Sequence, residues 1–196
     1  LTSETLDEDS ICDDTSIAIV DVNNDGRNEI IVASGGNEFK SGDAIKPRLY
    51  YIDNNEVFKD TTQFRNLELN ASKVSIVDLE NDGDLDICIV ANAEPHQFGI
   101  TPKKYIFKNN GSGQFTDVTD VLSQDFRLVG NVYDIVWKDI DGNSFKDAIV
   151  AGHWMPITSF INDGNKLSKL KVQGLEHTSG LLNTLDAIDF NNDGDI

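Results

Sequence analysis

Oxygen-bearing side chains recur at fixed offsets in four short segments of the sequence. The segments are DVNNDGRNEI (21–30), DLENDGDLDI (78–87), DIDGNSFKDA (139–148) and the shorter DFNNDGDI (189–196). In the three longer segments, positions 1, 3, 5 and 9 carry carboxylates or carboxamides, and position 7 offers a backbone carbonyl. The candidate metal ligands are Asp21, Asn23, Asp25, Arg27 (carbonyl) and Glu29; Asp78, Glu80, Asp82, Asp84 (carbonyl) and Asp86; Asp139, Asp141, Asn143, Phe145 (carbonyl) and Asp147; and Asp189, Asn191 and Asp193.

This ligand pattern matches the coordination chemistry of a hard divalent cation. Alternate spacing in a tight loop turns three oxygens inward, and a glycine at position 6 (Gly26 or Gly83) lets the chain reverse. Two carboxylates about 4 Å apart repel each other by roughly 4 kcal/mol at an effective dielectric of 20, so such a cluster favours a bound cation. A single Asp/Asn/Gly cluster is usually a solvated turn, but recurrence in register argues against that explanation.

The identity of the ligands selects among metals. With no His or Cys in the loops, zinc and copper are poor candidates, and a flexible cage of six or seven oxygens suits calcium better than magnesium. An EF-hand would need a bidentate Glu at position 12, where this sequence has Val32, Ile89 or Val150. We therefore expect two to three Ca²⁺ sites at β-hairpin turns, with an architectural role.

The elements that must hold these loops are predicted to be strands. Each complete loop lies between two apolar stretches rich in β-branched residues, such as SIAIV and IIVA around the first loop. Further downstream, Asn/Asp/Gly turns join two more strand-like stretches in each unit. The first residues of the four loops (21, 78, 139 and 189) are spaced by 57, 61 and 50 positions. Four strands per unit of this length predict an all-β fold of β-propeller blades, with almost no helix.

The repeats define the expected domain organisation. We expect one partial β-propeller domain over 1–196, with repeats at about 16–62, 73–119 and 133–172 and a truncated fourth at 184–196. Neighbouring blades are expected to cover the recurring aromatic residues Phe58, Phe115 and Trp137. Because the sequence begins without Met and stops inside a loop motif, we expect it to be a piece of a longer protein.

Composition excludes several classes of partner. Lys and Arg number 16 against 34 Asp and Glu, so the net charge is −18, which disfavours nucleic acid and anionic membrane surfaces. We expect no membrane insertion, because no apolar run approaches about 18 residues. Cys88 lies in the apolar run ICIVA and is expected to be a buried free thiol rather than to pair with Cys12.

The first two loops resemble the D-x-[DN]-x-D-G-x-x-[DE]-[IL] signature of the FG-GAP/VCBS repeats found in integrin-α-like β-propellers. KNNGSGQFTDVT and the residues around Trp154 are similar to bacterial members in secreted and surface proteins, and the resemblance extends from about Ser16 onward. It implies that each loop joins the first two strands of a blade and binds calcium. Relative to this signature, Asn143 and Ser144 depart from the preferred Asp and Gly. We therefore expect the third loop to bind weakest and the fourth to be incomplete.

Two functions remain open at this point. The first is a non-catalytic, calcium-stabilised scaffold for extracellular protein or glycan binding or adhesion, in which the loops Gly35–Pro47 and Asn92–Pro102, on the face away from calcium, contact the ligand. The alternative, implied by the resemblance alone, is part of a polysaccharide lyase or hydrolase. Its candidate residues are His96, Lys103, Lys104 and Tyr105.

No nucleophile motif supports the enzymatic alternative, and we expect no catalytic activity. Because weak calcium modules need the high calcium concentration found outside the cytoplasm, we expect an extracellular, cell-surface or periplasmic location. Three units cannot close a ring, so self-association of this fragment is a further expectation.

Overall fold

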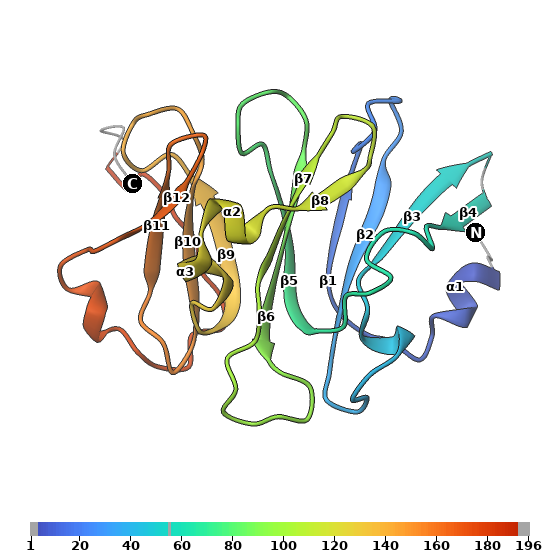
Figure 1. Cartoon of the computed structure of the whole chain (residues 1–196), viewed down its shortest axis with the longest axis horizontal. Coiled ribbons are helices and arrows are strands. Elements are labelled where there is room, and N and C mark those ends of the chain that lie inside the picture. The colour runs from blue at the N-terminus through green and yellow to red at the C-terminus, as the bar shows by residue number, and fades with distance from the viewer. Residues whose placement is uncertain (1–3, 55, 192–196) are drawn as a thin grey trace.

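A computed structural model describes residues 4–54 and 56–191, and shows three four-stranded antiparallel sheets arranged in series (Figure 1). Each sheet is a meander in which sequential strands are neighbours, and we call the sheets blades 1, 2 and 3. Blade 1 contains β1 (Asp13–Val20), β2 (Glu29–Gly35), β3 (Arg48–Asp53) and β4 (Glu56–Lys59); blade 2 contains β5 (Asn70–Val77), β6 (Asp86–Ala93), β7 (Tyr105–Asn109) and β8 (Phe115–Asp117); blade 3 contains β9 (Asn131–Lys138), β10 (Asp147–His153), β11 (Thr158–Asn162) and β12 (Leu167–Leu170). The predicted all-β class is confirmed.

Short helices occur where the sequence predicted almost none. They are α1 (Glu4–Glu8), α2 (Thr119–Leu122) and α3 (Gln124–Arg127), with 3-10 turns η1 (Asp43–Ile45) and η2 (Leu175–His177). The Ser123 hydroxyl caps α3 by accepting the Phe126 N–H at 3.2 Å. Phe126 is fully buried and packs edge to face on Phe160 of blade 3. Burial of one aromatic side chain between two blades therefore accounts for α3, a tertiary effect that local sequence does not report.

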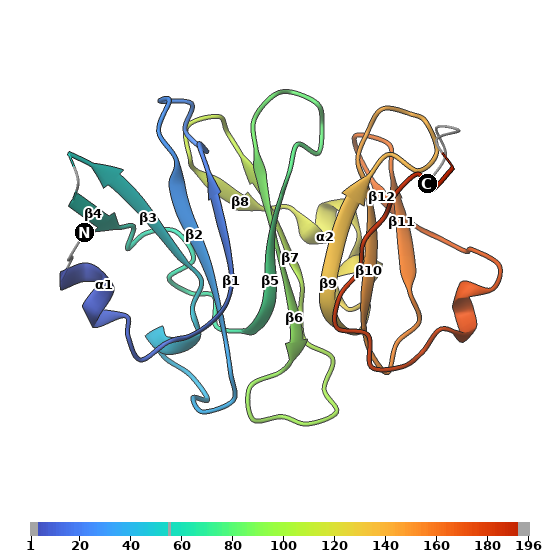
Figure 2. The ribbon, with the colours of Figure 1, turned by 180° about the vertical axis from the view of Figure 1, so that it is seen from behind.

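The two larger hydrophobic cores lie between neighbouring blades, and a smaller cluster lies on one face of blade 1. The strand β6 carries Ile87 and Ile89 in the core shared with blade 1, and Cys88 and Val90 in the core shared with blade 3. Because both faces of the strand are buried, its sequence reads as a continuous apolar run. The first strands β1, β5 and β9 lie beside one another in both views (Figures 1 and 2). Cys12 and Cys88 are both free, as expected.

Hydroxyl groups at the β-bulges of the first strands join adjacent blades. The Thr15 hydroxyl lies 3.0 Å from the Ala33 carbonyl in its own blade and 3.0 Å from the Ala71 carbonyl in the next. Ser72 repeats the arrangement with the carbonyls of Val90 and Val132. Each bulge thus redirects one polar side chain into the neighbouring blade.

The expectation that a neighbouring blade covers Phe58 is wrong. Phe115 and Trp137 pack against the interblade cores, whereas the Phe58 side chain is 49% exposed. Phe115 pairs with Asn109, but the pairing in blade 1 is shifted by one residue, so that Phe58 pairs with Tyr51 and Val57 with Ile52. A one-residue shift turns every side chain to the opposite face of the sheet, and Val57 takes the buried place instead.

The predicted first strand of a fourth unit does not form in the described residues 184–191. This segment runs beside blade 3 (Figure 2) and is fixed there by Asp134, whose carboxylate accepts the Leu185 N–H at 2.8 Å and the Thr184 hydroxyl at 3.1 Å. A strand needs a partner to satisfy its backbone groups, and no second strand of this unit is described.

Candidate metal centre

The three complete acidic loops lie at the same end of the blades, each between the first and second strand of its sheet (Figure 1). The loops between β2 and β3 and between β6 and β7 lie at the opposite end, as expected for Gly35–Pro47 and Asn92–Pro102. The meander topology thus separates an acidic end of the molecule from a second end built of longer loops.

The position-1 carboxylates organise the loops from within. Asp21 accepts the N–H groups of loop positions 5 and 6 at 3.3 and 2.8 Å. Asp78 accepts the same pair at 3.1 and 3.0 Å, and Asp139 accepts them at 3.1 and 2.8 Å. The three loops therefore share one backbone conformation, although their residues differ.

The position-9 carboxylates are buried beneath the loops. Glu29, Asp86 and Asp147 accept the N–H group of loop position 2 at 2.9, 3.0 and 2.8 Å respectively. Burial raises the pKa of all three groups, and it raises the pKa of the Asp86 carboxyl from its usual 3.8 to about 7. This pKa of Asp86 is a net result, in which burial and the neighbouring acids Glu80 and Asp82 raise the pKa and hydrogen bonds from the Asn109 and Leu79 N–H groups lower it.

The carboxylates of Asp139, Asp141 and Asp147 come together most closely. One carboxylate oxygen of each residue lies within 4.8 Å of one from each of the other two residues. Among the described residues, no other group of three Asp, Glu, His or Cys side chains comes together in this way. In the second loop, Glu80 forms an ion pair with Lys108, and its Oε2 atom is buried without a hydrogen-bond partner. In the first loop, position 3 is an amide, Asn23. The all-oxygen donors fit a hard divalent cation.

Positions 4 and 6 of each loop need a left-handed backbone. Position 4 has φ of 60° at Asn24, 58° at Asn81 and 77° at Gly142, and position 6 has φ of 85° at Gly26 and 90° at Gly83. In the third loop the glycine therefore occupies position 4, and Ser144 takes position 6 with φ of 75°. The departure of Ser144 from the preferred glycine therefore strains the backbone, because a residue with a Cβ atom is disfavoured in this region.

Replacing Ser144→Gly should stabilise the protein by about 1 kcal/mol, because glycine adopts this φ without a steric penalty. The reciprocal Gly83→Ser change should destabilise the second loop by a similar amount. A Cβ atom on Gly83 would meet nothing within 4 Å, so only the backbone conformation is tested. Urea denaturation of both variants measures the effects, and shifts of the same sign in the two would contradict this account.

Side-chain contacts join each loop to the next. The Asn24 amide lies 3.3 Å from both the Asp84 carboxylate and the Gly111 carbonyl of blade 2. The Asn81 amide donates to the Ser144 carbonyl of the third loop at 2.9 Å. In the first two loops, the asparagine at position 4 therefore has two roles, a left-handed turn and a contact with the following blade.

Sequence reasoning missed two buried asparagines that support the loops. Asn109 donates from Nδ2 to the Val22 carbonyl of the first loop at 2.7 Å and to the Leu85 carbonyl at 3.1 Å. Asn162 repeats this with Leu79 of the second loop at 2.9 Å and Lys146 at 3.1 Å. Both residues end the third strand of a blade immediately before a turn. An asparagine repeated at this position is the sequence feature from which their shared role could have been predicted.

The described residues include only the first part of the fourth loop. Asp189 is half-buried and Asn191 is exposed, while Asp193 lies outside the described residues. The expectation that this loop is incomplete therefore remains a prediction.

The residues proposed for the enzymatic alternative are not brought together. Lys103 and Tyr105 line one hollow, together with Arg127, and His96 lines another. Lys104 is fully buried, and its ammonium group donates to the carbonyls of Pro102 and Gly130. Burial lowers the pKa of Lys104 to about 7. The four candidate residues of the enzymatic alternative therefore do not share one site.

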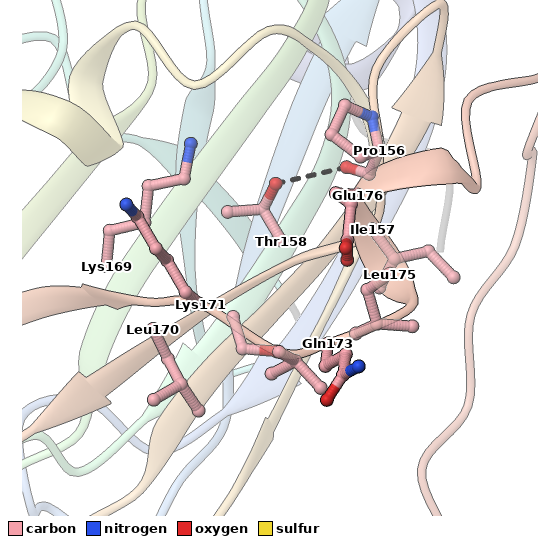
Figure 3. A pocket seen from close by; sticks show the side chains of 11 residues that line it. Pro156, Ile157, Thr158, Lys169, Leu170, Lys171, Gln173, Leu175 and Glu176 are labelled. Atoms are coloured by element: carbon pink, nitrogen blue, oxygen red, sulfur yellow. Dashed lines mark hydrogen bonds between the residues drawn. The ribbon is translucent and has the colours of Figure 1, made fainter.

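A hollow of about 440 Å³ beside β11 and β12 is lined by apolar and polar side chains in similar numbers (Figure 3). Ile157, Leu170 and Leu175 form part of its wall, and the Thr158 hydroxyl donates to the Pro156 carbonyl at 3.0 Å. No His, Cys or Asp is among its described lining residues. Glu176 is the one carboxylate of this described lining, so the hollow does not gather the several carboxylates that a calcium site needs.

Antiparallel four-stranded blades packed in series, with acidic loops at one end, define the class of partial β-propeller scaffolds. Residues 21–89 match the family model described as an FG-GAP-like repeat. The chain therefore carries an FG-GAP-like repeat region, which spans the first two acidic loops and reaches into β6. No curated protein matches the chain in sequence. Among the described residues, no helix has the length and apolar content needed to cross a membrane.

Proposed function

We propose that this protein is a calcium-stabilised, non-catalytic β-propeller scaffold for extracellular protein or glycan binding and adhesion. The main support is the group formed by Asp139, Asp141 and Asp147, whose oxygens lie within 4.8 Å of one another. Three carboxylates at such a distance repel one another unless a cation lies between them. The same internal hydrogen bonds in the other two loops extend the proposal to three sites.

The electrostatics of the whole chain also favour metal binding. Three divalent ions would change the net charge from −18 to −12, which reduces the repulsion within the folded chain. Calcium at hairpin tips would hold the first two strands of each blade, and the opposite end would remain available for a ligand. Because such sites need abundant calcium, the proposed location is extracellular, at the cell surface or periplasmic.

Isothermal titration calorimetry with CaCl₂ on the chelator-treated protein tests this proposal. We expect two to three ions per chain at pH 8, and equilibrium dialysis with elemental analysis provides an independent count. Asp141→Asn should weaken one site, whereas Glu56→Gln, an exposed acid on β4, is the matched control. A count of zero would refute the proposal.

The same titration should depend on pH. Because the Asp86 carboxyl has a pKa of about 7, calcium must compete with a proton there, and affinity at the second loop should be about tenfold lower at pH 6 than at pH 8. Without calcium, the free energy of unfolding should fall as the pH rises from about 4 to about 7. In this range the folded chain retains the proton on Asp86, which the unfolded chain has lost. Titrations in two buffers of different ionisation enthalpy measure the proton released.

A further inference from the structure

We propose that a cleft at the end opposite the acidic loops binds a neutral saccharide chain. The cleft has a volume of about 710 Å³ and lies among the loop that follows β6, the start of β9 and the residue after β10. A concave site of this size suits a small or chain-like ligand better than a folded protein, whose interface usually buries about 1,200–2,000 Å². The inference rests on the proposed scaffold function and specifies its ligand and site.

Aromatic rings form an exposed platform at this cleft. The side chain of Phe98 is 95% exposed and that of Trp154 is 66% exposed, and their ring centroids lie 6.3 Å apart at an interplanar angle of 74°. Tyr133 of β9 adds a third ring to the lining. Exposed aromatic side chains that lie side by side form an apolar patch of the kind that marks interaction sites, and their flat apolar faces match the C–H faces of sugar rings.

The platform is held in place by contacts around His153. Tyr133 stacks on the His153 ring with centroids 3.8 Å apart and an interplanar angle of 21°. The Nε2 atom of His153 lies 2.8 Å from the Asn183 carboxamide oxygen, and the backbone N–H of Trp154 donates to the Gly180 carbonyl at 2.8 Å. Such preorganisation lowers the entropic cost of binding.

Two lining residues adopt a backbone conformation that is costly for their type. Trp154 has φ of 57° and His96 has φ of 56°. The His96 N–H donates to the Asn37 carboxamide oxygen at 3.1 Å, which joins the loop of blade 2 to that of blade 1. Left-handed non-glycine residues persist where the surrounding structure enforces them, and they concentrate at binding sites.

The polar part of the lining is almost uncharged. It contains four carboxamide side chains, those of Asn37, Asn92, Gln97 and Asn131. Apart from Asn37, these side chains make no hydrogen bond to the described part of the chain, so their donors and acceptors are available. A carboxamide both donates and accepts, as a sugar hydroxyl does.

The charges at the cleft argue against an acidic glycan. Glu94 and His96 are the titratable side chains of the lining besides the Tyr133 phenol, and no Lys or Arg is among the described lining residues. An acidic polysaccharide would therefore find no cation in the cleft and would be repelled by a chain of net charge −18. These features select a neutral saccharide.

Affinity electrophoresis in native gels tests the inference. The probes are barley β-glucan, galactomannan and soluble starch as neutral polysaccharides, and alginate as the acidic one, all in calcium. We expect at least one neutral polysaccharide to retard the protein saturably, and alginate not to do so. Binding should also change the fluorescence of the protein, because Trp154 is one of only two tryptophans.

Substitutions identify the site. Trp154→Ala and Phe98→Ala should each weaken binding about tenfold, as expected when a central aromatic contact is removed. Phe58→Ala is the matched control, because Phe58 is exposed but lies on β4, away from the lining. Thermal melting of every variant, with and without calcium, reports whether the scaffold is intact.

Three results would overturn the inference. They are a lack of retardation by every neutral probe, retardation that Trp154→Ala and Phe98→Ala leave unchanged, and retardation by alginate that these variants abolish. If calcium still raises the melting temperature in those cases, the proposed scaffold function survives. If the protein binds a saccharide but has the same melting temperature with and without calcium, the proposed saccharide site is supported and calcium stabilisation is refuted.

Discussion

Exhaustive chelation with EGTA is expected to lower the melting temperature of this protein by about 5–10 °C for each calcium site that it empties. A ligand present at 100 times its Kd stabilises the folded state by about 2.7 kcal/mol, and 1 kcal/mol corresponds to about 2–4 °C for a chain of this size. The physical cause is repulsion among loop carboxylates such as those of Asp139, Asp141 and Asp147. Differential scanning calorimetry in CaCl₂ and in EGTA measures the shift.

Matched controls separate calcium from general ionic effects. Magnesium added in the presence of EGTA should restore little of the loss, because its strict octahedral geometry does not suit a flexible loop. Asp141→Asn keeps the shape of the side chain and removes its charge, so it should reduce the calcium-induced shift by part of the share of one site, because the first loop has an asparagine, Asn23, at the same position. Glu56→Gln should leave the shift unchanged. Identical melting in calcium and in EGTA would contradict an architectural role for the loops.

Removing the side chain of Asn109 should destabilise the protein by about 3 kcal/mol. Asn109 is buried, and its amide donates to the carbonyls of Val22 and Leu85, while its oxygen accepts the N–H groups of Gly111 and Gly113, both at 3.1 Å. Asn109→Ala leaves these groups without a partner, and each buried unsatisfied group costs about 1–3 kcal/mol. Urea denaturation measures the free energy of unfolding.

The neighbouring residue supplies the control for this experiment. Asn110 is exposed, and its side chain accepts hydrogen bonds only within its own turn, so Asn110→Ala should cost less than about 1 kcal/mol. Asn109→Asp keeps the acceptor and removes the donor toward Val22, and it should be as damaging as the alanine variant. If Asn109→Ala and Asn110→Ala were equally mild, Asn109 would have no role in joining the blades.

The sequence predicted the strands and the acidic loops because both depend on local chemistry. Apolar β-branched runs form strands in this structure, and the Asx-type bonds of Asp21, Asp78 and Asp139 arise within a few residues of each carboxylate. Recurrence in register then revealed the blades. The order of strands within each sheet followed from the hairpin turns that join them.

Features that depend on distant partners could not be predicted in this way. The helix α3 exists because Phe126 is buried against Phe160, and Phe58 is exposed because its hairpin is shifted by one residue. The truncated fourth unit expected over 184–196 forms no strand in its described residues 184–191, because a strand forms only when a second strand pairs with it. Asn109 and Asn162 act on carbonyls of the preceding blade, more than 80 residues away in sequence.

The contacts between loops also determine how the metal sites would communicate. The second loop is linked to the first through Asn24, and to blade 3 through Asn81 and Asn162. The loops therefore form a nearest-neighbour array in which ordering one member restricts its neighbours, the condition for positive cooperativity. The second loop is constrained from both sides. Metal binding at the first loop would therefore affect metal binding at the third loop through the second loop.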